Sequence, residues 1–342
     1  FITSVVISYL ITPFMAALAA RIGYLDHPKT NKVHAHSTPL LGGVAIAIAF
    51  FIAILSQWDI VKAFQMDPKI TALLAGAAVL LVLGLVDDRV GMGPNIKLFG
   101  QFMAAMILYK SGLRIGFLGG YYLNLAVTYL WLIGVTNAFN LLDNMNGLSA
   151  GIAVIASFFF GAIALINNQW MVAIISFALC GSCLGFLRYN FPKARIFMGD
   201  AGSLVVGFLL SSLAIFGNWK SYGLTTSIAV PLLVLAYPIF DTTLVTVMRI
   251  REGRSIFQGG RDHSSHRLAL LGFKSKRAVL VIYAICITLG VSAMMVSILP
   301  FINGVFIIGF VFLALLLLGI RLSMVDTGRF GRKKGLRKIG GR

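Results

Sequence analysis

"ITALLAGAAVLLVLGLVDD", residues 70–88, is an almost continuous apolar run that ends in two adjacent aspartates. A strand of a membrane β-barrel would alternate apolar and polar residues, and this run does not. It is long enough to cross the ~30 Å hydrocarbon core of a bilayer as an α-helix, in which each backbone polar group is satisfied within the segment. The stretch therefore predicts a helical membrane span with a pair of carboxylates at one end.

Runs of the same kind recur along the whole chain. Of its 342 residues, 58% are hydrophobic and 12% are charged, and the mean hydropathy is +0.91, which excludes a globule with a polar surface. We predict an all-α integral membrane protein with a catalytic domain over residues 1–321 and a basic tail over residues 322–342. About eleven transmembrane helices are expected, near residues 2–20, 41–57, 70–86, 96–110, 122–138, 149–166, 169–187, 202–217, 224–248, 278–299 and 301–321.

Lysine and arginine are distributed unevenly between the two ends of these helices. All but five of the 29 fall in residues 21–40, 87–97, 188–195, 249–277 and the tail from 321. The exceptions are Lys62, Lys69, Lys110, Arg114 and Lys220. Because cytoplasmic loops keep positive charge, we expect the N-terminus outside and the C-terminus in the cytoplasm of a multi-pass protein. The net charge of +18 then favours anionic lipids and substrates, whereas no module with stacking aromatics indicates nucleic acid.

The acidic residues gather at the same predicted face, and only Asp59 and Asp67 belong to an outer loop. Asp87 and Asp88, in "GLVDDRVGMGPN", repel each other unless a cation or a base neutralises them, which favours metal or substrate chemistry. The alternative is a solvated helix end with Arg89 as the partner.

A second polar group follows in "NAFNLLDNMNGLSAG", residues 137–151. Asn137, Asn140 and Asp143 recur every three residues, so they share one helical face, and such groups are costly in lipid unless they line a wet cavity. A helix cap and a turn at Gly147 explain the end of this motif but not the three aligned polar residues.

Two further motifs carry charge. In "RYNFPKARIFMGDAGSL", Asp200 precedes an apolar run whose free N–H groups are expected to face a phosphate while Asp200 holds Mg²⁺; the alternative is a simple N-cap. In "RDHSSHRLALLGF", His263 and His266 lie between cations, a pattern that favours an anion over a transition metal. The segment "DHPKTNKVHAHSTPLLGG" adds another His and Lys group, for which a solvated loop is the alternative.

Carboxylates for a hard cation, cations for phosphates and glycine turns for close backbone approach are used together in phosphoryl transfer. The membrane face suggests that one reactant is a lipid. These five motifs, in this order, resemble those of the polyprenyl-phosphate N-acetylhexosamine-1-phosphate transferases, and the resemblance spans residues 21–273. The basic loop is closer to the WecA and TagO branch, which uses UDP-GlcNAc, than to the MraY branch, the phospho-MurNAc-pentapeptide transferases of peptidoglycan synthesis.

The resemblance implies ten or eleven transmembrane helices in the bacterial inner membrane, usually as a homodimer, with cytoplasmic active-site loops at residues 21–40, 87–97, 137–150, 188–203 and 249–277. It implies transfer of N-acetylhexosamine 1-phosphate from a UDP-sugar to undecaprenyl or another polyprenyl phosphate, with release of UMP, in the first membrane step of a cell-envelope polysaccharide. The cofactor would be Mg²⁺, with Mn²⁺ as the alternative ion.

Residue roles are also carried over from the family. The implied catalytic residues are Asp87, Asp88, Asp143, Asp200, His263 and His266, with Asp200 as the metal ligand and Asp87 and Asp88 as further candidate ligands. The implied substrate-binding residues are Lys32, His34, Asn137, Asn140, Asn146, Asn190, Phe197, Arg261 and Arg267. Among these, Asn190 and Phe197 match the positions that hold and stack the uracil. The chain departs from the family at Asn146, where a second aspartate is usual, and at Ser265, where a histidine is frequent.

We expect the lipid phosphate to attack the β-phosphorus of the UDP-sugar directly, because a phosphate monoester is already mostly dianionic at pH 7. The alternative is an aspartyl-phosphate intermediate with ping-pong kinetics. A transporter or flippase of an anionic lipid is a different function for the same bundle; however, its charges would lie near the bilayer midplane, and the sequence shows no internal repeat.

Overall fold

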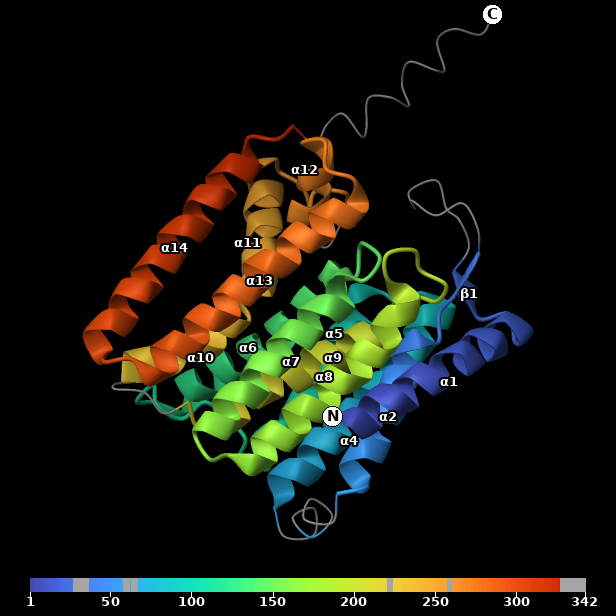
Figure 1. Cartoon of the computed structure of the whole chain (residues 1–342), viewed down its shortest axis with the longest axis horizontal. Helices are drawn as coiled ribbons and strands as arrows, with labels where there is room; N and C mark the ends of the chain where they lie inside the picture. The colour runs from blue at the N-terminus through green and yellow to red at the C-terminus, as the bar shows by residue number, and fades with distance from the viewer. Residues whose placement is uncertain (27–36, 58–61, 63–66, 220–223, 257–259, 327–342) are drawn as a thin grey trace, which may run out of the picture.

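The computed structural model describes residues 1–26, 37–57, 62, 67–219, 224–256 and 260–326. It is a helical bundle (Figure 1). The elements are α1 (Ile2–Arg21), β1 (Leu25–Asp26), β2 (Thr38–Pro39), α2 (Gly42–Leu55), α4 (Pro68–Val90), α5 (Pro94–Lys110), α6 (Tyr121–Leu142), α7 (Leu148–Ile166), α8 (Trp170–Asn190), α9 (Gly199–Phe216), α10 (Leu224–Val234), α11 (Ala236–Arg251), α12 (Ser264–Leu270), α13 (Ser275–Ile298) and α14 (Phe301–Ser323). The all-α prediction is confirmed.

Within the described residues, eight helices are long and apolar enough to cross a membrane, and α10 and α11 add a ninth if they are taken as one bent span. Each of the eleven predicted ranges contains helix, but α2 is shorter than a full span. The count of eleven spans and the orientation of the termini therefore stay predictions. The chain is a multi-pass membrane protein by the length and composition of these helices.

The predicted continuous helix over residues 224–248 is wrong. The chain bends by 73° between α10 and α11. Pro238 explains the break, because it has no N–H to donate to the carbonyl of Val234 and its ring would clash with that carbonyl. Two smaller differences are the short helix α12 inside the predicted loop 249–277 and the antiparallel pair β1–β2, in which Leu25 lies opposite Pro39.

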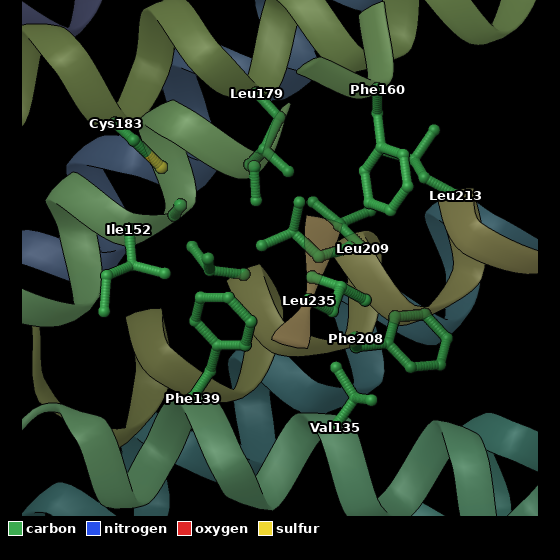
Figure 2. Packing of buried hydrophobic residues seen from close by; sticks show 14 of the residues in the cluster. Val135, Phe139, Ile152, Phe160, Leu179, Cys183, Phe208, Leu209, Leu213 and Leu235 are labelled. Atoms are coloured by element: carbon green, nitrogen blue, oxygen red, sulfur yellow. The ribbon is translucent and has the colours of Figure 1, made fainter. Parts of the chain in front are cut away.

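Helix α9 forms the centre of the bundle and is buried along nearly its whole length among α2, α4, α6, α7 and α8. Figure 2 shows the apolar packing around it, where Leu209 lies between Leu179 of α8 and Phe139 of α6, and Phe208 lies on the side of Val135 of α6. The apolar packing around α9 leaves little room for charged side chains in the middle of the bundle. The charged groups accordingly gather at the helix ends.

Glycines let the helices approach α9 most closely at its first turn. A Cβ atom on Gly43 of α2 would overlap the backbone of Gly202, and one on Gly84 of α4 would overlap the backbone of Ala201. Such contacts between small residues are typical of helices packed within a membrane. Because Asp88 follows Gly84 by one turn, this packing places the acidic end of α4 against the N-terminus of α9.

Candidate active site

The acidic pair lies in the last turn of α4, which continues to Val90 and ends at Gly91 with a left-handed φ of 70°. Asp87 is buried, and its Oδ1 accepts a hydrogen bond of 2.7 Å from the backbone N–H of Met92. Asp88 points instead at the first turn of α9. The two adjacent carboxylates therefore have different surroundings.

Asp88 caps the N-terminus of α9 from another helix. Its Oδ1 accepts from the N–H of Asp200 at 2.8 Å and its Oδ2 from the N–H of Ala201 at 3.1 Å. Gly199 has φ 70°, and a side chain there would also press against the Asp88 carboxylate. A carboxylate at a helix N-terminus is stabilised by the orphan N–H groups and by the helix dipole.

This arrangement corrects three expectations for the motif around Asp200. The helix begins at Gly199, not at residue 202, and Asp200 lies in its first turn, so it is not the N-cap. The N–H groups of Asp200 and Ala201 are engaged by Asp88 and are not free for a phosphate. The side chain of Asp200 is consequently available for other partners.

Lys97, in the first turns of α5, lies between two of the acids. Its Nζ is 2.6 Å from Oδ2 of Asp200 and also forms an ion pair with Oδ2 of Asp87. The side chains of Lys97 and Asp200 are 24% and 29% exposed, so this group is open to ligands. We refer to Asp87, Asp88, Lys97 and Asp200 as the acid centre.

The polar face of α6 supports the acid centre. Asn140 donates from Nδ2 to Oδ1 of Asp200 at 2.7 Å and is 2.9 Å from Oγ of Ser203. One turn earlier, Asn137 donates to Oε1 of Gln101 on α5 at 2.7 Å. The predicted alignment of these asparagines thus joins α6 to α5 and α9.

Asp143 is the C-cap of α6 and lies close enough to Asp200 of the acid centre to feel its charge. Burial, together with the negative charge of Asp200, raises the pKa of Asp143 to about 7. Asn146, at the position where the family usually has an aspartate, is exposed, and its Nδ2 is 3.5 Å from the carbonyl oxygen of Pro192. The turn predicted at Gly147 is confirmed by its left-handed φ of 77°.

Asn190 is buried and fully engaged with backbone groups. Its Oδ1 accepts from the N–H of Gly147 at 2.7 Å, and its Nδ2 donates to the carbonyl of Ile196 at 2.8 Å. Asn190 therefore ties the α6–α7 turn to the α8–α9 connection. Phe197 is partly buried beside it, between β2 and α2, and its N–H donates to the carbonyl of Pro39 at 2.8 Å. The uracil contacts implied for Asn190 and Phe197 stay predictions, and Lys32 and His34 lie outside the described residues.

The second cluster is the basic loop, residues 260–267, which lies against α11. His263 Nδ1 is 2.8 Å from Oδ2 of Asp241, while Oδ1 of Asp241 accepts from the N–H of Ser264 at 2.7 Å. Asp241 is completely buried and His263 is 4% exposed. With Asp241 ionised, Nδ1 of His263 carries a proton, and Nε2 is the nitrogen left for a ligand.

His266 and Arg267 differ in their surroundings. Nδ1 of His266 is buried and has no hydrogen-bond partner among the described residues. Burial and the nearby His263 and Arg261 lower the pKa of His266 to about 4, so its ring is neutral at pH 7. Arg267 is completely buried, and its guanidinium donates to the carbonyls of Asp262, Leu322 and Val325, which anchors the loop to the end of α14. The roles implied for these side chains stay predictions.

One hydrogen bond connects the basic loop to the turn after α6. Ser265 donates from Oγ to Oδ1 of Asn144 at 2.8 Å. Asn144 directly follows Asp143, so the loop and the acid centre occupy the same end of the bundle, as Figure 1 shows for α12 and the α6–α7 connection. Ser265 is the second position that departs from the family pattern, and here it makes this link.

The structure thus brings Asp87, Asp88 and Asp200 together, as expected, with Asp143 close by. Among the described residues, no group of three or more His, Cys, Asp or Glu side chains is arranged to hold a metal ion by itself. Mg²⁺ does not need such a cage, because it usually binds one or two carboxylates, waters and substrate phosphates. Asp87 and Asp200 already share one cation, the Lys97 ammonium, so this pair fits a divalent ion completed by phosphate oxygens.

Three residues of the site were not predicted. Lys97 gave no local signal beyond its place in an inner loop, and its role depends on how α5 packs on α4. Asp241 did give a signal in the sequence, since burying a lone acid inside an apolar run costs free energy unless the acid has a buried partner. Gln101 gave the same signal in α5 and pairs with Asn137.

Comparison with known proteins extends this picture. The family model described as glycosyl transferase family 4 matches residues 70–218, which include the whole acid centre. A Bacillus subtilis protein named probable undecaprenyl-phosphate N-acetylglucosaminyl 1-phosphate transferase is 35% identical, over 87% of this chain and 84% of that protein. A Mycobacterium tuberculosis protein named decaprenyl-phosphate N-acetylglucosaminephosphotransferase is 32% identical, over 82% and 78%. The Escherichia coli K12 protein named undecaprenyl-phosphate alpha-N-acetylglucosaminyl 1-phosphate transferase is 28% identical, over 79% and 75%.

Proposed function

The chain belongs to glycosyl transferase family 4, and from this premise we propose that it transfers N-acetylglucosamine 1-phosphate from UDP-GlcNAc to a polyprenyl phosphate, releasing UMP. The relatives' names support the polyprenyl phosphate acceptor and the transferred group. The uridine diphosphate donor is our inference from the motifs. Undecaprenyl phosphate is the acceptor that we assign, and the product serves cell-envelope polysaccharide synthesis.

The observation that carries the proposal is the pair of carboxylates from different helices that share one cation. Asp87 ends α4 and Asp200 begins α9, and Lys97 contacts both. An anionic diphosphate would not approach two bare carboxylates, so the pair requires positive charge before it can take part in phosphoryl transfer. We propose Mg²⁺, or Mn²⁺ in its place, held by Asp200 with Asp87 as the second ligand. When bound, the ion would neutralise charge on the diphosphate oxygens.

Asp88 acts as a positioning group in this account. Both of its oxygens accept backbone N–H groups of α9, which fixes the first turn of that helix and the direction of the Asp200 side chain. A carboxylate held in this way is a poor nucleophile, which supports direct attack of the lipid phosphate on the β-phosphorus over an aspartyl-phosphate route. No general base is needed, because the acceptor phosphate has a second pKa of about 6 and is mostly deprotonated at pH 7.

The basic loop would bind the diphosphate of the donor. His263 is oriented by Asp241, and protonation at Nε2 would let it donate to a phosphate oxygen. His266 Nδ1 lacks a partner among the described residues, so a donor group of the substrate would also satisfy it. The Ser265–Asn144 hydrogen bond sets the position of this loop relative to Asp143.

The finer membrane arrangement is part of the same proposal. We place eleven spans in the bacterial inner membrane, with the N-terminus outside and with the acid centre and basic tail in the cytoplasm, as the distribution of Lys and Arg indicates. Residues 1–321 would form the catalytic domain and assemble as a homodimer. The lipid acceptor then reaches the site from the inner leaflet, and the nucleotide sugar reaches it from the cytosol.

The test is release of UMP by the purified full-length protein. With undecaprenyl phosphate, Mg²⁺ and UDP-GlcNAc, we expect UMP and lipid-linked GlcNAc diphosphate in equal amounts, and no UMP when the lipid is omitted. UMP release without lipid would favour the aspartyl-phosphate route. A preference for UDP-MurNAc-pentapeptide would move the chain to the peptidoglycan branch, and inactivity with both donors would contradict the proposed reaction.

A further inference from the structure

A pocket of ≈ 430 Å³ lies at the end of the bundle opposite the acid centre, where α5 ends and α6 begins. Its walls include Tyr109, Lys110, Arg114, Tyr121 and Tyr129. Lys97 and Lys110 both belong to α5, and their separation along the chain corresponds to about 20 Å along a helix axis. The pocket is therefore separate from the proposed catalytic machinery.

No Asp or Glu is among the described residues that line this pocket. The sequence from residue 89 to residue 142 contains no Asp or Glu, and Lys110 and Arg114 are exposed and form no ion pair with a described residue. Arg114 lies over the ring of Tyr109, with its Cζ 5.4 Å from the ring centroid. A third cation is adjacent, because Lys69 Cε lies 4.0 Å from where a Cβ on Gly112, which lines the pocket, would be.

Two of the five cations in predicted outer loops, Lys110 and Arg114, thus line one pocket, and a third, Lys69, lies beside it. Membrane proteins tend to avoid Lys and Arg in short loops on that side. Asp67 lies two residues before Lys69 and accepts its backbone N–H, whereas Lys110 and Arg114 form no ion pair with a described residue and require compensation from a ligand or from water. If these Lys and Arg side chains only extended to water, we would expect them to point in different directions around the helix ends. Their grouping at one pocket instead favours the binding of an anionic ligand.

The aromatic residues indicate what accompanies the anion. The Tyr109 and Tyr129 ring centroids are 6.0 Å apart, and those of Tyr109 and Tyr121 are 6.4 Å apart in an edge-on arrangement. Tyrosines combine apolar ring faces with a hydroxyl group, which suits the boundary between a lipid head group and its acyl chains. Leu125 and Met106 extend this wall with apolar surface.

We propose that this pocket binds the phosphate head group of an anionic membrane lipid from the leaflet opposite the acid centre. Lys110 and Arg114 contact the phosphate, and the tyrosine rings pack against the glycerol and the first methylene groups. A soluble phosphate has the same charged group but lacks the apolar part. The proposal does not depend on the transferase activity.

Native mass spectrometry of the delipidated full-length protein tests this assignment. With equimolar phosphatidylglycerol and phosphatidylcholine, we expect one phosphatidylglycerol to bind most tightly. The double variant Lys110→Gln/Arg114→Gln should bind it about 30-fold more weakly, at about 1 kcal/mol per cation near a membrane surface. The matched control Lys276→Gln/Arg277→Gln removes one lysine and one arginine, both exposed, from the start of α13 and should keep the tight site.

Equal phosphatidylglycerol affinity in the wild type and in the Lys110/Arg114 variant would overturn the proposal, as would equal binding of the two lipids. Displacement of the lipid by millimolar glycerol 3-phosphate would show a site for soluble phosphate and would overturn the lipid assignment. Thermal unfolding of each variant verifies the fold. UMP release in a zwitterionic detergent should stay unchanged in the Lys110/Arg114 variant, which separates this test from that of the transferase.

Discussion

The acid centre and the basic loop lie at the same end of the bundle but are built differently. In the acid centre, like charges from α4 and α9 are brought together by glycine contacts, and one shared lysine holds Asp87 and Asp200. In the basic loop, two buried acids already have cationic or imidazole partners, Asp241 with His263 and Asp262 with Arg249. The acid centre thus depends on a cation, whereas the basic loop is already arranged before a ligand arrives.

The largest effect is expected from Asp200→Asn. Removing the charge from the proposed metal ligand should lower kcat by on the order of 10³-fold, because a charge that stabilises the transition state is lost. UMP release at saturating substrates measures the loss. The control Asp67→Asn makes the same chemical change at the N-terminus of α4, at the end of the helix away from the acid centre. Asparagine can keep the N-cap there, so the rate should be unaltered. Near-normal turnover in Asp200→Asn would contradict the metal assignment.

Replacing Lys97 tests whether the acids need their shared cation. Lys97→Met leaves Asp87 and Asp200 without their shared ammonium group. We expect turnover to fall about 10²-fold, because repulsion between the two carboxylates moves them apart. Lys97→Arg keeps the charge and should retain more activity than Lys97→Met. Initial rates at several Mg²⁺ concentrations measure the effect, and equal rates in both variants would show that the charge is not required.

Asp262 tests whether the basic loop, unlike the acid centre, is stabilised by ion pairs that exist before a ligand binds. Burial opposes its ionisation, but Arg249 donates to both carboxylate oxygens, and its hydrogen bonds and charge outweigh that effect and lower the pKa of Asp262 to about 2. The folded pKa is below the unfolded value of about 3.9, so ionised Asp262 stabilises the fold above that pH and loses this effect as the pH falls toward 2.

Asp262→Asn should therefore lower the free energy of unfolding by on the order of 2 kcal/mol near pH 6, and the difference from the wild type should shrink below about pH 4. Thermal unfolding in detergent between pH 3 and about pH 7 measures it. A difference that stayed constant over this range would show that the ionised pair contributes nothing.

The smallest effect is expected from Asp241→Asn, which loosens the orientation of His263. If the loop binds the diphosphate, the KM for UDP-GlcNAc should rise about tenfold while kcat changes less, because binding and not chemistry is impaired. Ser264→Ala removes another contact of Asp241 but leaves the Asp241–His263 bond, and it should keep the wild-type KM. A fall in kcat alone would assign Asp241 to another role.

The same two regions show what a sequence can predict. Apolar runs fixed the helices, and acids at the ends of those runs pointed to a shared site, because the ends of packed helices meet at a membrane face. The N-terminal cap of α9 by Asp88 was not predictable, since it depends on close packing at Gly43 and Gly84. The helix limits around residues 199–202 were missed for the same reason.

The break between α10 and α11 carried a readable signal. Pro238 lies inside the apolar run, and the missing N–H of a proline is a local property of the sequence. The Asp241–His263 pair could be predicted only in part, because a buried acid requires a partner but the sequence does not say which residue provides it. Tertiary packing therefore decides partners, while local chemistry decides where partners are needed.

Binding of Mn²⁺, followed by electron paramagnetic resonance, tests most directly whether the acid centre holds a divalent ion together with a diphosphate. In the presence of UDP-GlcNAc, the full-length wild-type protein and Asp67→Asn should each bind one Mn²⁺ per chain with coupling to phosphorus, and Asp200→Asn should lose this signal. Undiminished, phosphorus-coupled Mn²⁺ in Asp200→Asn would contradict the account.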